Sequence, residues 1–275
     1  SVYRLEHNPV LKIHNRQQYF IQMSLASYIV VVGSISQCLF SPMSLHLRSS
    51  AASPDLSDVF GKIYDEKLWG SGPEDGMGSG SGSSISNTDL LRRSLADFIQ
   101  SKSIHEMYDI PCGTMYWTRP FLNGIWQSDK SFTYVGMDVA KGVVNDLNRS
   151  IKDPRVSVLH RNVAAQGFEK VDVRDPEHSM VMSRQMLQHL SDVDVCQALK
   201  NLFRIPAKYF LVDYFPEEVS NEDITSGEFR AINLQAPPFN LPVPEKILDD
   251  DPQYPRQMFV YKLSELRNAN ICDGL

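Results

Sequence analysis

Two acidic residues of this chain each end a short apolar run, at positions where side chains can meet a ligand. Asp109 closes the first run, and Asp138 closes the run FTYVGMD at 132–138. The first acid opens a tight loop with a single glycine, DIPCG at 109–113. This loop is compatible with an ordinary strand-to-helix turn. It is also compatible with a cofactor site, in which small side chains let the backbone approach a ligand.

The chemistry of the two acids narrows the choice of cofactor. An acid at the end of a second strand can accept two hydrogen bonds from a ribose diol. A loop that cradles a pyrophosphate has the pattern GxGxxG, whereas DIPCG has one glycine and begins with an acid. An acid suits a ligand with a cationic amino-acid end better than one with phosphates. The combination points to S-adenosylmethionine, with its sulfonium, ammonium and ribose diol, unless the two acids end strands by chance.

A repeating strand–helix pattern has to position these acids. Strands are expected at 104–109, 132–138, 156–159, 179–183, 208–215 and 257–263, and helices at 115–127, 140–151 and 192–203. Strands that alternate with helices indicate a mostly parallel sheet with helices on both faces. In such sheets ligands bind beyond the carboxyl ends of the strands, which is where Asp109 and Asp138 stand.

A Gly/Ser-rich tract lies upstream of this pattern. GMGSGSGSS at 76–84 precedes a predicted helix that Asn87 or Thr88 can cap. Such tracts are typical of flexible linkers, and the alternative is a lid whose glycines let backbone approach a ligand. In a lid, three side chains around the tract would add stacking and anion contacts: Tyr64, Trp69 and Arg92.

Residues 1–58 differ in composition from the rest of the chain. The run at 19–40 is apolar and uncharged, which leaves open a secretory signal, a signal anchor, or a leader without targeting function. Polar residues 49–58 are expected to be a linker, so we place the folded domain at 59–275. The compartment stays open between the cytosol and the secretory pathway. We expect membrane contact only if 19–40 anchors the chain.

Composition excludes some classes of function. The chain has 275 residues, of which 42% are hydrophobic and 22% charged, as in a globular protein with one α/β domain and extensions. A net charge of −6 without a long Lys/Arg run argues against binding to duplex nucleic acid. The four cysteines form no CxxC pair, so we expect neither a zinc site nor a dense disulfide framework and assign no metal ligands.

Five stretches stand in the order of a known family: YDIPCGTMYW, YVGMD, SRQMLQHLS, KYFLVDYF and INLQAPPFNLPVP. They resemble a group of class I S-adenosylmethionine-dependent methyltransferases, over about residues 60–263. The resemblance implies a Rossmann-like α/β fold, with a seven-stranded, mostly parallel sheet and helices on both faces. Its strand order would be 3-2-1-4-5-7-6, with the last strand antiparallel. It also implies methyl transfer from S-adenosylmethionine to an acceptor that the sequence leaves unidentified: a small molecule, a glycan or a protein side chain.

The resemblance also implies positions around the cofactor. Asp109 and Gly113 would line its methionine end, and Asp138 would take the ribose hydroxyls. Asn162 with Val163, just after the third strand, would reach the adenine. We expect further cofactor contacts from six residues of the loop, the lid region and the end of the fourth strand: Pro111, Cys112, Trp117, Trp69, Arg92 and Arg184.

The chain departs from the family pattern at two positions. Thr114 and Gln185 stand where the family has Asp, and an amide cannot act as a base. His189 is the best candidate for a base toward a hydroxyl acceptor, because its unperturbed pKa is about 6.5. The alternative is a histidine at a helix start whose ring is satisfied by the backbone. Arg184 is the second catalytic candidate, and it would either bind an acidic substrate or pair with an acid inside the fold.

The acceptor side of the site is the least determined. Gln185, Arg230 and Asn233 are the candidates for contacts with the acceptor, and the proline run at 236–244 is either a rigid wall or a crossing loop. Three hypotheses remain. The first is an active methyltransferase, and the second is a degenerate methyltransferase-like protein that binds the cofactor or acts as a scaffold. The third is a nucleotide-sugar or NAD enzyme on the same sheet, and the missing GxGxxG weighs against it.

Overall fold

A computed structural model describes residues 55–250 and 255–273, which belong to one compact unit. The run at 19–40 lies outside the described residues, as do 1–54 as a whole. Within the described part of the chain, no helix is long and apolar enough to cross a membrane.

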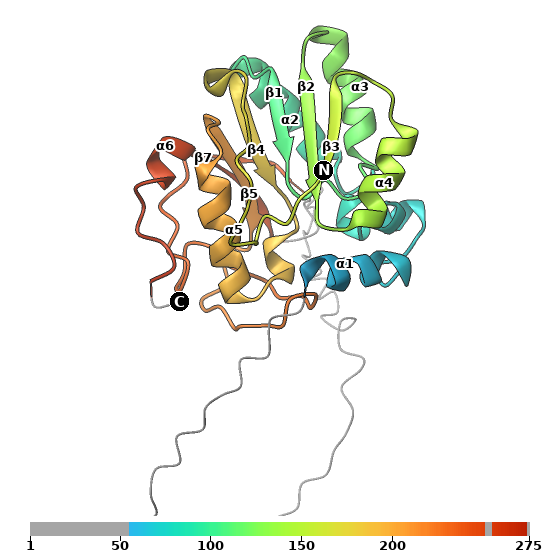
Figure 1. The fold of residues 1–275 in the computed structure, drawn as a ribbon. Helices are drawn as coiled ribbons and strands as arrows, with labels where there is room; N and C mark the ends of the chain where they lie inside the picture. The colour runs from blue at the N-terminus through green and yellow to red at the C-terminus, as the bar shows by residue number, and fades with distance from the viewer. Residues whose placement is uncertain (1–54, 251–254, 274–275) are drawn as a thin grey trace, which may run out of the picture. The chain divides into compact units, whose positions relative to one another are not determined.

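Seven strands form one sheet with the order β3-β2-β1-β4-β5-β7-β6 (Figure 1). The strands are β1 (Glu106–Asp109), β2 (Thr133–Asp138), β3 (Val156–His160), β4 (Ser179–Ser183), β5 (Tyr209–Tyr214), β6 (Lys246–Leu248) and β7 (Gln257–Lys262). β1 to β5 pair in parallel, and β7 is antiparallel to both β5 and β6. The predicted fold class and strand order are therefore confirmed.

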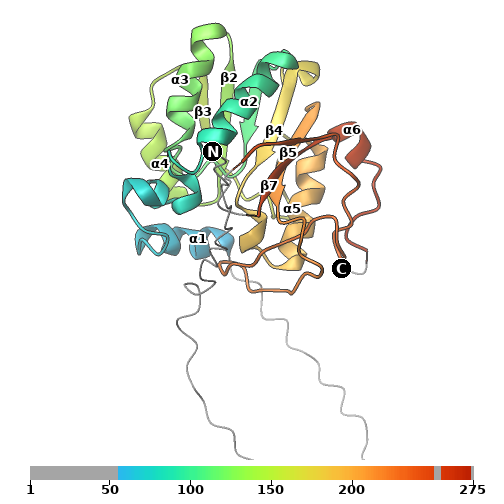
Figure 2. The same cartoon turned by 180° about the vertical axis from the view of Figure 1, so that it is seen from behind.

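Helices cover both faces of the sheet. They are α1 (Leu56–Asp65), α2 (Asp89–Ser101), α3 (Thr118–Ser128), α4 (Lys141–Ser150), α5 (Asp192–Arg204) and the short α6 (Leu263–Leu266). Figure 1 is seen from the side of α5, and Figure 2 from the side of α2. Successive strand residues point to opposite faces. Tyr108 and Val181 accordingly pack with α1 and α5, whereas Met107 and Met180 pack with α2, α3 and α4.

Helix α1 differs from the sequence-based expectation. It begins at Leu56, inside the stretch expected to be a linker, where the Asp55 side chain accepts a hydrogen bond from the Ser57 N–H at 2.9 Å. Its buried face carries Leu56, Phe60 and Ile63. Leu56, Val59, Phe60 and Ile63 stand at helical spacing, so the pattern was present in the sequence, and the helix was missed because its start was assigned to the polar linker at 49–58.

A disulfide joins the α5 face to the end of the described chain. Cys196 of α5 and Cys272 are bonded, with their Cα atoms 5.8 Å apart, and both side chains are buried. The cysteine spacing gave no reason to pair them, because they lie 76 residues apart. Cys112 is a buried free thiol.

Candidate functional site

A cavity opens at the carboxyl ends of β1, β2 and β4. Counting its open mouth, it encloses about 850 Å³. The predicted residues that line it are Trp69, Asp109, Pro111, Cys112, Gly113, Trp117, Asp138, Asn162, Val163, Arg184, Gln185 and His189. The structure thus brings together residues from the loop after β1, the ends of β2 to β4 and the segment after α1. Such a position is where open parallel sheets bind ligands.

Asp138 ties the end of β2 to the loop after β1. One carboxylate oxygen accepts the Gly113 N–H at 2.9 Å, and the other accepts the Ala140 N–H at 2.8 Å. The side chain is buried, and burial raises the pKa of Asp138 against the lowering effect of these N–H donors. A carboxylate has about four lone-pair sites, so two remain for a ligand in the cavity.

Asp109 faces the same cavity from β1. One of its oxygens accepts the Tyr134 hydroxyl at 2.7 Å, and no described residue hydrogen-bonds to the other. Burial raises the pKa of Asp109 to about 7, while the Tyr134 hydrogen bond and the positive charge of Arg184 act in the opposite direction. A cation that binds beside this carboxyl group would lower its pKa and so favour the ionised form.

The Gly/Ser-rich tract packs against the loop after β1. The Ser79 hydroxyl accepts the Thr114 N–H at 2.9 Å and donates to the Thr114 hydroxyl at 3.1 Å, and Thr114 donates to the Gly76 carbonyl at 2.8 Å. Gly113 has a positive φ of +53°, and a Cβ there would lie 2.6 Å from the Ser79 hydroxyl oxygen. The tract is therefore docked on the site by specific contacts, which favours the lid interpretation over a linker.

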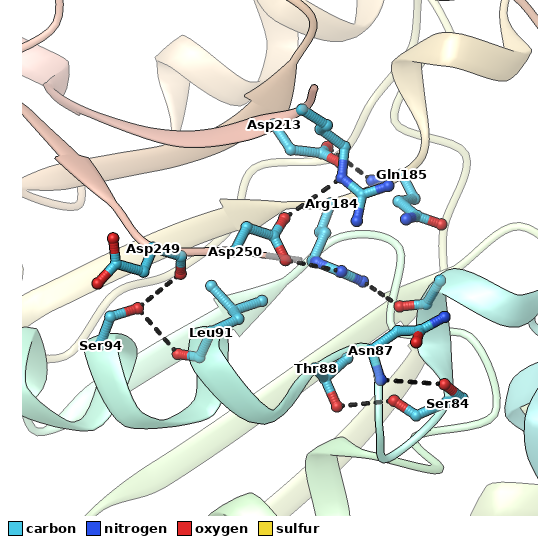
Figure 3. A network of polar contacts seen from close by, with 12 residues as sticks. Ser84, Asn87, Thr88, Leu91, Ser94, Arg184, Gln185, Asp213, Asp249 and Asp250 are labelled. Atoms are coloured by element: carbon cyan, nitrogen blue, oxygen red, sulfur yellow. Dashed lines mark hydrogen bonds and ion pairs between the residues drawn. The ribbon is translucent and has the colours of Figure 1, made fainter. Parts of the chain in front are cut away.

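The same tract is held from the β4 side by Arg184. Its guanidinium donates to the Gly82 carbonyl at 2.8 Å and to Asp250 at 3.0 Å (Figure 3). The guanidinium also lies 5.9 Å from the centre of the Trp117 ring. The side chains of Arg184 and Asp250 are almost fully buried. Of the two roles considered for Arg184, the structure has the pairing with an acid inside the fold. The arginine still lines the cavity with part of its side chain.

Gln185 belongs to the same polar network. Its backbone N–H donates to Asp213 at 2.7 Å, and its φ is +53°. With the amide oxygen turned toward Arg256, that oxygen accepts from the guanidinium at 2.9 Å. Arg256 also pairs with Asp213 at 3.1 Å and with Asp250 at 3.3 Å. Two arginines and two aspartates already balance in charge here, so a neutral amide fits this position without adding a buried charge.

His189 stands at the mouth of the cavity on a short 3₁₀ turn, Leu187–His189. Its Nδ1 donates to the Glu228 carbonyl at 2.8 Å, which fixes the proton on Nδ1 and leaves Nε2 as an acceptor. Its ring lies 4.9 Å from Trp69 and 5.5 Å from Phe229. Burial lowers the pKa of His189 below its ordinary value, so the imidazole is neutral at pH about 7.

The loop after β3 forms the far wall of the cavity. The Asn162 side-chain oxygen accepts the Ala164 N–H at 3.0 Å, and Asn201 of α5 donates to the Val163 carbonyl at 2.7 Å. Val163 is buried, and together with Met137 it makes this end of the cavity apolar.

Three predicted residues do not reach the cavity. Arg92 bonds to the Ile85 carbonyl at 3.1 Å and to Asp89 at 3.2 Å on α2. Arg230 is buried, pairs with Asp192 at 2.7 Å and donates to the Leu190 carbonyl at 3.1 Å. The Asn233 amide donates to the carbonyls of Pro216 and Glu218 at 3.1 and 2.8 Å. The structure therefore places these three side chains outside the lining of the cavity, where they bond to other parts of the fold.

Some residues near the site were not anticipated. Leu56 and Phe60 reach the cavity from α1, and Ser79 and Ser83 reach it from the Gly/Ser tract. Asp213, Asp250 and Arg256 support the β4 end of the site from segments far along the chain. An acid at the end of β5, in KYFLVDYF, was visible in the sequence, but its buried arginine partner 43 positions later was not.

No family profile and no curated protein matches the chain. PigF with S-adenosylhomocysteine has a TM-score of 0.50 at 13% identity, over 74% of this chain and 62% of that one. Magnesium protoporphyrin IX methyltransferase from Synechocystis PCC 6803 with bound S-adenosylmethionine has a TM-score of 0.47 at 11% identity, over 78% of this chain and 99% of that one. Human N-acetylserotonin methyltransferase with S-adenosylmethionine has a TM-score of 0.46 at 9% identity, over 74% of this chain and 59% of that one.

These similarities concern the fold. The aligned part spans less than two thirds of the PigF and N-acetylserotonin methyltransferase chains. Identities of this size leave the acceptor and the site residues of this chain unassigned. The strand order with its antiparallel β7, together with the similarity to PigF, shows that the chain has the Rossmann-like fold of class I methyltransferases.

Proposed function

We propose that the protein is an S-adenosylmethionine-dependent methyltransferase. The observation that carries this proposal is the pair of buried carboxylates, Asp109 and Asp138, at the ends of adjacent parallel strands in one cavity. Two acids disfavour a ligand that brings phosphates to this loop, and they favour one with an ammonium group and a ribose diol.

The groups present fit that cofactor. The two lone-pair sites left on Asp138 suit ribose hydroxyls, and the Asp109 oxygen without a described partner suits the ammonium group. The apolar end of the cavity, at Met137 and Val163, suits the adenine ring. When bound, S-adenosylmethionine supplies an activated methyl group on its sulfonium sulfur.

The chain itself would supply alignment, exclusion of water and a proton acceptor. Methyl transfer depends mainly on holding the acceptor in line, so a docked Gly/Ser tract that covers the loop after β1 serves the reaction by keeping out water. His189 would take the acceptor proton on Nε2, because Nδ1 is committed to the Glu228 carbonyl. Gln185 would support Arg256 and would have no acid–base role.

Calorimetry tests the proposal through the cofactor. S-adenosylmethionine and S-adenosylhomocysteine are expected to bind, whereas NAD is expected not to. Asp138→Ala should weaken both sulfur compounds by about a hundredfold, because two hydrogen bonds to a charged group are lost. Asp146→Ala, which changes an exposed acid on α4, is the matched control and should bind as the wild type does. Failure of both sulfur compounds to bind would refute the proposal.

A second candidate function is binding of the cofactor without turnover. It is favoured by Gln185, which replaces a family carboxylate and is held by Arg256 and Asp213. Transfer of an isotope-labelled methyl group to an acceptor separates the two candidates. Loss of transfer in His189→Ala, with cofactor affinity kept, would exclude the second.

A further inference from the structure

An aromatic rim stands on the His189 side of the cavity, where Trp69 and His189 line the cavity and Phe229 lies beside His189, outside the lining. We use this name for Trp69, His189 and Phe229, whose neighbouring rings lie 4.9 and 5.5 Å apart. Phe229 is 63% exposed although it is a large apolar side chain, and its ring makes an edge contact with the buried Phe215 at 6.5 Å. An apolar ring left in water next to a cavity is typical of a ligand-contacting position.

The charges near the rim disfavour an anionic ligand. Both arginines that line the cavity have carboxylate partners, Arg161 with Glu169 at 2.5 Å and Arg184 with Asp250 at 3.0 Å. The segment that leads to Phe229 carries five exposed acids: Glu217, Glu218, Glu222, Asp223 and Glu228. A negative charge on an incoming molecule would be repelled by this segment and would meet arginines that are already paired.

We propose that the methyl acceptor is an uncharged aromatic hydroxyl compound, of the phenol class. Its ring would lie against Trp69 and Phe229, and its hydroxyl would donate to Nε2 of His189. This inference rests on the proposed function and adds to it the chemical class of the acceptor.

The strength of the base agrees with this class of acceptor. The Nδ1 atom of His189 donates to a neutral backbone carbonyl and not to a carboxylate. Burial lowers the pKa of His189, so the imidazole is a weak base. A weak base removes a proton more readily from a phenol than from an aliphatic alcohol, because the phenol is the stronger acid. Contact with the rings of Trp69 and Phe229 adds attraction for an aromatic acceptor, and this attraction does not depend on charge.

The transfer step balances in atoms and charge. The proton of the acceptor hydroxyl goes to Nε2 of His189, and the acceptor oxygen forms a bond to the methyl carbon. The carbon–sulfur bond breaks, and its electron pair stays on sulfur, which becomes a neutral thioether. The products are an aryl methyl ether, S-adenosylhomocysteine and a protonated imidazole that returns its proton to water.

Three compounds of similar size test the acceptor class. Naphthol is neutral and aromatic, hydroxynaphthoate adds a negative charge, and decahydronaphthol is a neutral alcohol without aromatic rings. Each is titrated by calorimetry into the protein saturated with S-adenosylhomocysteine and is also incubated with S-adenosylmethionine, with the methyl ether measured by mass spectrometry. Naphthol is expected to bind at least about tenfold more tightly than the other two, and to be the only one methylated.

Variants locate the ring contact. Phe229→Ala should weaken naphthol binding by about tenfold, and Phe229→Tyr should restore it, because a stacked aromatic pair gives about this factor. Ile247→Ala, at an exposed apolar position on edge strand β6, is the control and should leave binding unchanged.

The outcomes separate this inference from the proposed function. If S-adenosylhomocysteine binds but naphthol binds no better than decahydronaphthol or hydroxynaphthoate, the acceptor class is wrong and the cofactor assignment stands. An unchanged naphthol affinity in Phe229→Ala would also overturn the inference. If neither S-adenosylhomocysteine nor S-adenosylmethionine binds in the preceding titration, the proposed function itself fails.

Discussion

Asp109 gives the site a dependence on pH. Its carboxyl group has a pKa of about 7 and is surrounded by the Tyr134 hydroxyl, Arg184 and the carboxylate of Asp138. Because the folded-state pKa is raised, ionisation opposes folding increasingly as pH rises from the unfolded value of about 4 toward 7. Burial of Asp109 therefore lowers the free energy of unfolding near neutral pH, and a bound ammonium group would offset part of this loss.

We expect the affinity for S-adenosylmethionine to fall by up to tenfold per pH unit below pH about 7 and to level off above it. The protonated carboxyl group lacks the charge that attracts the ligand's ammonium group. Calorimetry at several pH values measures this slope. Asp109→Asn should bind weakly, lose the slope and be more stable than the wild type at pH about 8. A wild-type affinity independent of pH would contradict the role given to Asp109.

At the scale of elements, the Gly/Ser tract and the loop after β1 behave as one unit, and Thr114 connects them. Thr114→Val keeps the side-chain shape but removes the hydroxyl's bonds to the Gly76 carbonyl and the Ser79 hydroxyl, at a loss of about 2 kcal/mol. Amide hydrogen exchange in 76–84 should quicken in this variant and stay slow in Thr114→Ser, which keeps the hydroxyl. Equal exchange in Thr114→Val and the wild type would show that this contact does not hold the tract.

The sequence predicted the secondary-structure elements better than it predicted the hydrogen-bond partners of individual side chains. Continuous apolar runs in β4 and β5 and the acids that end β1 and β2 predicted parallel strands and the position of the cavity, whereas the strand order came from the family resemblance and β6 was not anticipated. Arg230 and Asn233 lie outside the cavity lining, bonded to Asp192 and to backbone carbonyls, and a sequence does not show which groups a buried polar side chain will bond to. For the same reason, the sequence did not decide whether the Gly/Ser tract is a linker or packs on the site. Gly82 of the tract, for example, packs against a residue far along the chain: a Cβ there would lie 2.0 Å from the side-chain amide of Gln185.

At the scale of the whole molecule, the Cys196–Cys272 disulfide fastens the end of the described chain to α5. The bond spans 76 residues, and a loop of this size corresponds to about 4 kcal/mol of stabilisation through the unfolded state. Reduction should therefore lower the Tm by roughly 10 °C in a calorimetric scan. The double variant Cys196→Ser, Cys272→Ser should match the reduced wild type. Neither cysteine lines the cavity, so cofactor affinity should not change. An identical Tm with and without reductant would contradict this role.

The most direct test of the proposed cofactor site is a crystal structure of the protein with S-adenosylhomocysteine. We predict that the ligand lies in the cavity at the ends of β1 and β2, with its ribose hydroxyls hydrogen-bonded to Asp138. Its ammonium group is predicted at Asp109 and its adenine between Met137 and Val163. Electron density for the ligand at another place, or a ribose that does not contact Asp138, would contradict the proposed site.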